Sequence, residues 1–178
     1  VTGRVDGNAG HDQLDFSSDA SRDMLITGMG TTDGVQGWDA VNPADRAVSL
    51  GFDNIDELIA SAAAGDSLTG ADLAATFTFG VDDRYSYDGK FALFSGFEIL
   101  NGGSRADTFA FSGTATFTGE LNGSGGSDRL DYSAYDNAAT VDLQSHTATG
   151  LVGTFGGIEN LTGSSSSDTL IGADTGAT

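Results

Sequence analysis

The chain has 178 residues and no cysteine, and its 26 acidic and 7 basic residues give a formal net charge of −19. Without cysteine, disulfides and thiolate metal sites are excluded. Nucleic acid is excluded as an expected partner, because its phosphates pair with Lys and Arg. No apolar stretch reaches the roughly 20 residues of a membrane-spanning helix. We expect one domain over residues 1–178, as an excerpt of a longer repeat array.

The first predicted element is a glycine-rich turn, "DGNAGHDQLDFSSD" at 6–19, which recurs as "NGSGGSDRLDYSAY" at 122–135. Both phrases contain one shorter unit: an apolar residue, any residue, Gly or Ser, four residues of any kind, Asp, any residue, and an apolar residue. This unit occurs six times, and its aspartates are Asp12, Asp33, Asp66, Asp107, Asp128 and Asp168. The intervals between them are 21, 33, 41, 21 and 40 residues. Four of these are one or two multiples of about 20, and the 33-residue interval is one multiple plus a surplus of about 13 residues.

The surplus falls on the second predicted element, residues 38–50, which hold the only Trp and the only Pro of the chain. A repeating strand cannot absorb such an insertion without losing register, so we expect 38–50 to project as a loop. The next segment, 54–65, has a capping-box spacing that allows a short helix. Its alignment with "GIENLTGSSSSD" at 157–168 favours a turn of the repeat instead.

Strand-like stretches with alternating apolar residues follow this segment. They are "ATFTF" (75–79), "KFALF" (90–94), "TFAF" (108–111), "TATFTG" (114–119) and "ATVDL" (139–143).

A period of about 20 residues is too short for a helical repeat, which predicts an all-β fold, a parallel β-helix (β-solenoid) with about 20 residues per coil. Stacked coils would align like residues, with Asp at one corner and an apolar ladder inside. The expected inward residues are Leu14, Phe109, Leu121, Leu130, Leu161 and Leu170.

The phrases "GSGGSDRLD" (123–131) and "GNAGHDQLD" (7–15) resemble the Gly-Gly-x-Gly-x-Asp-x-apolar-x nonapeptide of the repeats-in-toxin (RTX, haemolysin-type) calcium-binding proteins. "FEILNGGSRADTFAF" (97–111) and "GIENLTGSSSSDTLIG" (157–172) are similar to phrases from very large secreted bacterial surface proteins built of parallel β-helix arrays. The resemblance implies an extracellular location at the bacterial cell surface, an adhesive or fibrous role, and no enzymatic activity.

The same resemblance implies calcium as a cofactor. RTX nonapeptides follow one another without a gap, whereas here the motif occurs at most once per coil. The expected calcium ligands are Asp107 and Asp128 on successive coils, then Asp12 and Asp33, and Asp168. The alternative is that these aspartates only accept hydrogen bonds from backbone amides of their own turns.

A second reading is a carbohydrate-active β-helix, either a polysaccharide lyase or a hydrolase, or a glycan-binding module. Its best local cluster lies between Asp82 and Lys90 and includes Arg84, Tyr85 and Tyr87. The alternative for this cluster is an extended surface turn with no binding or catalytic role. The two readings differ in whether the carboxylates form a regular corner ladder or converge in one groove.

We therefore expect a structural segment of a surface fibre, adhesin stalk or filament, which calcium would stiffen if the resemblance extends to the cation sites. Its expected partners are identical or neighbouring repeat units stacked end to end, together with surface glycans. Both ends of the sequence lie inside the repeat motif, without the dissimilar capping repeat that closes many solenoids.

Overall fold

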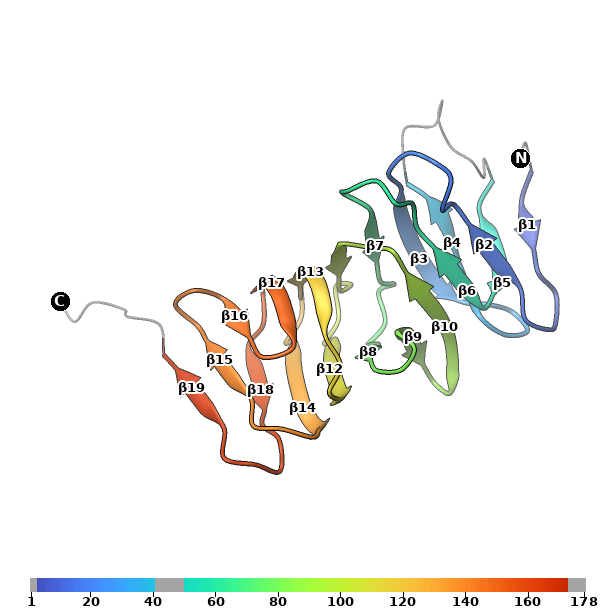
Figure 1. Cartoon of the computed structure of the whole chain (residues 1–178). Helices are drawn as coiled ribbons and strands as arrows, with labels where there is room; N and C mark the ends of the chain where they lie inside the picture. The colour runs from blue at the N-terminus through green and yellow to red at the C-terminus, as the bar shows by residue number, and fades with distance from the viewer. Residues whose placement is uncertain (1–2, 41–49, 173–178) are drawn as a thin grey trace.

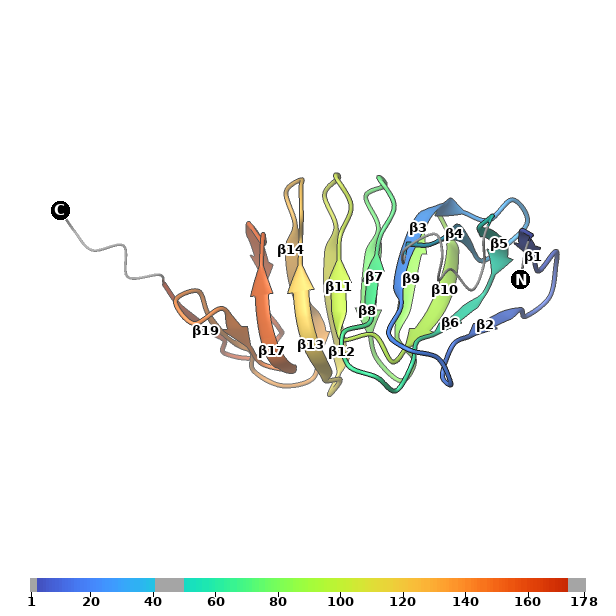
Figure 2. The ribbon, with the colours of Figure 1, turned by 90° about the horizontal axis from the view of Figure 1, so that it is seen from above.

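The computed structural model describes residues 3–40 and 50–172, and all regular structure in these ranges is β-strand. The strands form two long mixed sheets and one small sheet, stacked along one axis into an elongated body (Figures 1 and 2). No helix among the described residues has the length and apolarity needed to cross a membrane.

The first sheet has the spatial order β1 (Val5–Asp6), β5 (Phe52–Ile55), β4 (Val35–Asp39), β3 (Asp23–Met29), β7 (Ser67–Thr69), β11 (Ile99–Asn101), β13 (Phe117–Asn122) and β17 (Leu151–Gly156). The second has the order β18 (Asn160–Thr162), β14 (Arg129–Tyr135), β12 (Thr108–Gly113), β8 (Thr76–Phe79), β9 (Arg84–Tyr87), β10 (Lys90–Ser95), β6 (Glu57–Ile59) and β2 (Gln13–Asp15). The third contains β16 (Thr147–Ala148), β15 (Thr140–Asp142) and β19 (Thr169–Ile171).

Parallel stacking is regular in the middle of the chain, where the chain alternates between the two long sheets. Leu100 of β11 pairs with Leu121 of β13, and Phe109 of β12 pairs with Leu130 of β14, so each step is 21 positions. This confirms the predicted register of the two central repeats and their parallel stacking. The architecture is consistent with a β-solenoid.

The constant period is wrong elsewhere, because extra strands are inserted between stacked ones. Strands β3, β4 and β5 form an antiparallel meander in the first sheet, and β8, β9 and β10 form one in the second. The β15–β16 hairpin is a third insertion. Leu68 therefore pairs with Leu100, 32 positions on, and Leu121 pairs with Phe155, 34 positions on.

The repeat unit that begins at Ile26 is not a turn between stacked strands, which corrects the sequence prediction. It spans the antiparallel β3–β4 hairpin, closed by a hydrogen bond from the Gly30 amide to the Gly34 carbonyl (3.0 Å). The predicted loop also begins later than residue 38, because Trp38 and Asp39 belong to β4. Residues 41–49 of that loop lie outside the described residues. Residues 54–65 contain no helix, as expected from the alignment.

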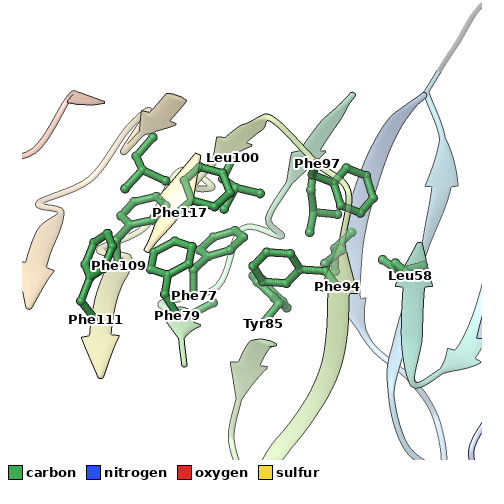
Figure 3. Packing of buried hydrophobic residues seen from close by; sticks show 14 of the residues in the cluster. Leu58, Phe77, Phe79, Tyr85, Phe94, Phe97, Leu100, Phe109, Phe111 and Phe117 are labelled. Atoms are coloured by element: carbon green, nitrogen blue, oxygen red, sulfur yellow. The ribbon is translucent and has the colours of Figure 1, made fainter. Parts of the chain in front are cut away.

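The core between the sheets is an aromatic stack that follows the axis (Figure 3). Phe77 and Phe109, which pair in register, stack with ring centroids 5.1 Å apart and an interplanar angle of 8°. Phe111 and Tyr132 stack with the same distance and angle. Such aromatic pairs contribute about 0.5–1.5 kcal/mol each beyond their area burial, so the interior couples successive strands.

The predicted inward ladder is correct in the middle of the stack. Phe109, Leu121 and Leu130 are buried, and Leu14 is half-buried against the core. Leu161 and Leu170 were wrongly placed inside: they are 38% and 58% exposed. Leu161 does stack on Leu130, but among the described residues no strand lies beyond β18 or β19 to cover these side chains.

Candidate functional site

The conspicuous polar feature of the molecule is a set of carboxylates at the corners where the chain enters a strand. At the entry to the second sheet, the Ala75 amide donates to Asp107 Oδ1 (2.9 Å) and the Asp107 amide donates to Asp128 Oδ1 (2.7 Å). The Asp128 amide donates in turn to Glu159 Oε2 (2.8 Å). Each carboxylate thus accepts the corner amide of the neighbouring stacked strand.

The glycine of the repeat unit is explained by the aspartate five residues later. The Asp107 carboxylate folds back over its own turn, where Oδ2 accepts the Gly103 amide (2.7 Å). A side-chain carbon at Gly102 would lie 2.5 Å from the Gly123 carbonyl oxygen, which follows the neighbouring strand β13, and 2.7 Å from Asp107 Oδ2, so there is no room for a larger residue. In the third unit Ser61 replaces this glycine, and its hydroxyl donates to Asp66 Oδ2 (2.7 Å).

The entry to the first sheet repeats this arrangement with other residues. The Arg22 amide donates to Asp66 Oδ1, and the amides of Gly65 and Asp66 both donate to Glu98 Oε2 at 3.0 Å. At the entry to the third sheet, Asp168 Oδ1 accepts the Ala139 amide (2.8 Å).

The six aspartates of the repeat do not form one ladder, which corrects the predicted single corner. Only Asp107 and Asp128 are direct neighbours in one stack. Asp66 and Asp168 occupy corners of the first and third sheets, while Asp12 pairs with Asp56, whose Oδ2 accepts the Asp12 amide (3.0 Å). The sequence signal failed here because the apolar residue that opens the unit lies on different sheets in different copies.

Asp33 lies in the β3–β4 turn, and its carboxylate reaches the turn of Asp12 through a hydrogen bond from the Gly10 amide to Asp33 Oδ2 (3.4 Å). One buried oxygen of each of these two carboxylates, Asp12 Oδ2 and Asp33 Oδ1, has no hydrogen-bond partner. At Asp107 both oxygens accept amides. The two parts of the molecule therefore differ in how completely their carboxylates are satisfied.

Burial and hydrogen bonding shift these carboxylates in opposite directions. Burial raises the pKa of Asp107 and of Asp128, and the neighbouring charges of Asp128 and Glu159 respectively add to that increase. At exposed Asp168, the hydrogen bond from the Ala139 amide lowers the pKa. The corner carboxylates inside the stack are thus costly to ionise, whereas the outer turn favours ionised Asp168.

Sequence reasoning missed the corner residues Glu98, Glu159 and Asp56. A signal for the two glutamates was present: Gly96, Glu98 and Leu100 recur as Gly157, Glu159 and Leu161.

The local cluster between Asp82 and Lys90 is divided by the sheet. Tyr85 is buried in the core, where its hydroxyl oxygen accepts the Ala71 amide (3.0 Å), and burial raises its pKa to about 12. Lys90 Nζ donates to the Gly30 carbonyl (2.6 Å). Arg84 and Tyr87 are exposed.

Among residues 3–40 and 50–172, no group of three or more His, Asp or Glu side chains is placed to hold a metal ion. No protein-family model matches the chain, and no curated protein and no solved structure matches it either.

Proposed function

We propose that this chain is a structural segment of a secreted bacterial surface fibre, adhesin stalk or filament. In this proposal the chain is a parallel β-helix in which one coil has about 20 residues, and inserted hairpins enlarge some of the coils. The observation that carries the proposal is the open end formed by β18 and β19. Each is the last strand of its sheet among the described residues, and both lie at the same end of the stack (Figure 1).

This end has the chemistry of a stacking surface. Leu161, Leu170 and Ile171 are 38%, 58% and 42% exposed there, and they continue the internal register: Leu161 pairs with Leu130 and Leu170 pairs with Val141. The outer edges of β18 and β19 also carry backbone groups that a further strand would satisfy. We propose that an identical or neighbouring repeat unit stacks on this end.

The test is assembly of the purified chain as a function of concentration. We expect end-to-end rods by electron microscopy and growth in light scattering, because head-to-tail contacts need not close. Replacing Leu170 and Ile171 with Lys should prevent this growth. The control is Val81→Lys, which adds one positive charge at a fully exposed position, 102% by relative area, in the turn between β8 and β9. A monomer at every concentration, or equal growth of the double variant, would exclude the proposal.

The proposal assigns no enzymatic activity to the chain. Its support is the distribution of the carboxylates: those of the repeat are separated at strand entries and bind backbone amides, instead of converging in one groove as a glycosidase pair does.

We also propose that calcium binds between Asp12 and Asp33, because one buried oxygen of each carboxylate lacks a hydrogen-bond partner. A hard cation binds six to eight oxygens, so neighbouring turn carbonyls would complete the set. At Asp107, Asp128 and Asp168 the carboxylates already accept amides. We expect millimolar calcium to raise the melting temperature of the native chain and not that of Asp33→Ala, with Asp168→Ala as the control. Equal responses of all three chains would remove calcium from the Asp12–Asp33 pair.

A further inference from the structure

The outer face of the β8–β9–β10 meander carries a groove of about 810 Å³. This volume falls in the range of about 300–1,000 Å³ that is typical of ligand sites. The groove is independent of the stacking end, since it lies on the second sheet in the middle of the body. Its position follows from an insertion, because β9 is the antiparallel strand that separates β8 from β10.

Cross-strand pairing sets the floor of the groove in two rows. Thr76, Ser86 and Phe91 form one row, since Ser86 of β9 pairs with both of the others. Thr78 and Arg84 pair in the second row. Successive side chains of a strand alternate between faces, so the residues that lie between these two rows point inward. Phe77 and Tyr85 form that intervening row, and both are buried. The outer rows combine hydroxyl groups, a guanidinium and an aromatic ring.

Two aromatic residues that line the groove keep exposed side chains: Phe91 in the outer row, and Tyr87, which pairs with Lys90 beside the β9–β10 turn. Phe91 is 45% exposed and Tyr87 is 37% exposed. The Arg84 guanidinium lies over the Phe91 ring, 5.3 Å from its centroid, and so holds both groups at the groove. Exposed aromatic rings beside satisfied polar groups are typical of binding surfaces.

The two turns of the meander bound the groove with carboxylates. Since β9 runs antiparallel to both neighbours, the β8–β9 turn and the β9–β10 turn lie at opposite ends of β9. The first turn contributes Asp82 and the second contributes Asp88, and both residues line the groove. Hydrogen-bond acceptors therefore stand at its two ends, and donors and hydroxyl groups lie between them.

We propose that this groove binds a neutral polysaccharide chain. A sugar ring has an apolar C–H face that fits an aromatic ring, and a rim of hydroxyls that pair with carboxylates, hydroxyl groups and a guanidinium. Because residues of both turns line it, the groove extends along β9 and accommodates a chain of such rings. Acidic polysaccharides are disfavoured, because the chain carries a net charge of −19 and Lys90 of the groove already donates to the Gly30 carbonyl.

The test is calorimetric titration of the full chain with neutral hexasaccharides of β-1,4-glucose, β-1,3-glucose and β-1,4-mannose, and with alginate hexamers. We expect binding of at least one neutral oligomer and weaker binding of alginate. Phe91→Ala and Tyr87→Ala should each weaken that binding by about tenfold, since each removes a ring. Phe91→Tyr should retain it. Val152→Ala on β17 replaces an exposed side chain of the first sheet, far from the groove, and should leave it unchanged.

Three results would overturn the proposal. They are no binding of any neutral oligomer at millimolar concentration, binding of alginate alone, and neutral binding that Phe91→Ala and Tyr87→Ala leave unchanged. Far-UV circular dichroism and the melting temperature of each variant establish that a loss of binding does not come from unfolding. Both side chains are exposed, so the fold is expected to persist.

Discussion

Asp107→Ala tests whether the corner carboxylates hold successive strands together. Asp107 is 1% exposed. One of its oxygens accepts the Ala75 amide at the entry to the neighbouring strand β8, and the other accepts the Gly103 amide of its own turn. Alanine leaves both N–H groups in place without an acceptor. A buried donor that loses its partner costs about 1–3 kcal/mol. We therefore expect the free energy of unfolding to fall by roughly 1–3 kcal/mol for the buried Ala75 amide, and by a smaller amount for the half-buried Gly103 amide.

The matched control is Asp72→Ala. Asp72 accepts the Ser104 amide (3.2 Å), one residue from Gly103, but it is exposed to water. Water replaces this lost partner, so the change should be within about 0.5 kcal/mol. Urea unfolding followed by circular dichroism measures both variants, with calcium and with chelator. Equal stability losses for the two variants would refute the corner argument. A loss at Asp107 that appears only with calcium would mean that the carboxylate binds the cation and not the amides.

Three further predictions concern the buried ladder, one close backbone approach and one exposed carboxylate. Leu130→Ala, in the buried ladder, should lower the free energy of unfolding by about 2–5 kcal/mol in urea titrations. Gly119→Ala should destabilise by about 1–3 kcal/mol or more, because its φ is +150° and a methyl group there would clash with the Glu98 carbonyl oxygen; a stable variant would contradict this close approach. The Ala139 amide lowers the pKa of Asp168, so this contribution to stability is present above the unfolded value of 3.8 and is lost as pH falls through the folded pKa. Asp168→Asn should therefore reduce the decrease in melting temperature that the native chain shows as the pH is lowered. If the decrease is the same in both chains, other groups cause the acid unfolding.

The sequence predicts the turn chemistry of this protein better than its topology. Gly102 and Asp107 are five residues apart because the carboxylate occupies the space above the glycine. The same contact recurs at Gly7, Gly123 and Gly163, but not at Gly28, where the Gln36 side chain occupies that space. The 21-residue step from Leu100 to Leu121 follows from the same phrase.

The antiparallel strands could not be predicted in this way. "RYSY" at 84–87 shows the same alternation whether β9 runs parallel or antiparallel to its neighbours, since side-chain alternation does not depend on strand direction. Nor does the sequence indicate the sheet on which the last repeat begins. The β15–β16 hairpin lengthens the connection after β14, so Leu161 arrives on the second sheet, whereas Leu100 and Leu121 lie on the first. The groove depends on β9 and was visible only as a local cluster of polar and aromatic residues.

The choice between aspartate and glutamate at a corner follows from the length of the turn that precedes the strand. Where a longer glycine turn leads into the strand, Asp107 reaches both its own Gly103 amide and the neighbouring Ala75 amide. Where only three residues separate the strands, as after β10 and β17, the corner residue is Glu98 or Glu159, whose longer side chain reaches only amides of the neighbouring strand. Because the corners present N–H donors, a carboxylate, with acceptors on both oxygens, suits them better than an amide side chain does. The net charge of −19 can therefore arise from the way the strands are joined, and it does not by itself require a cation.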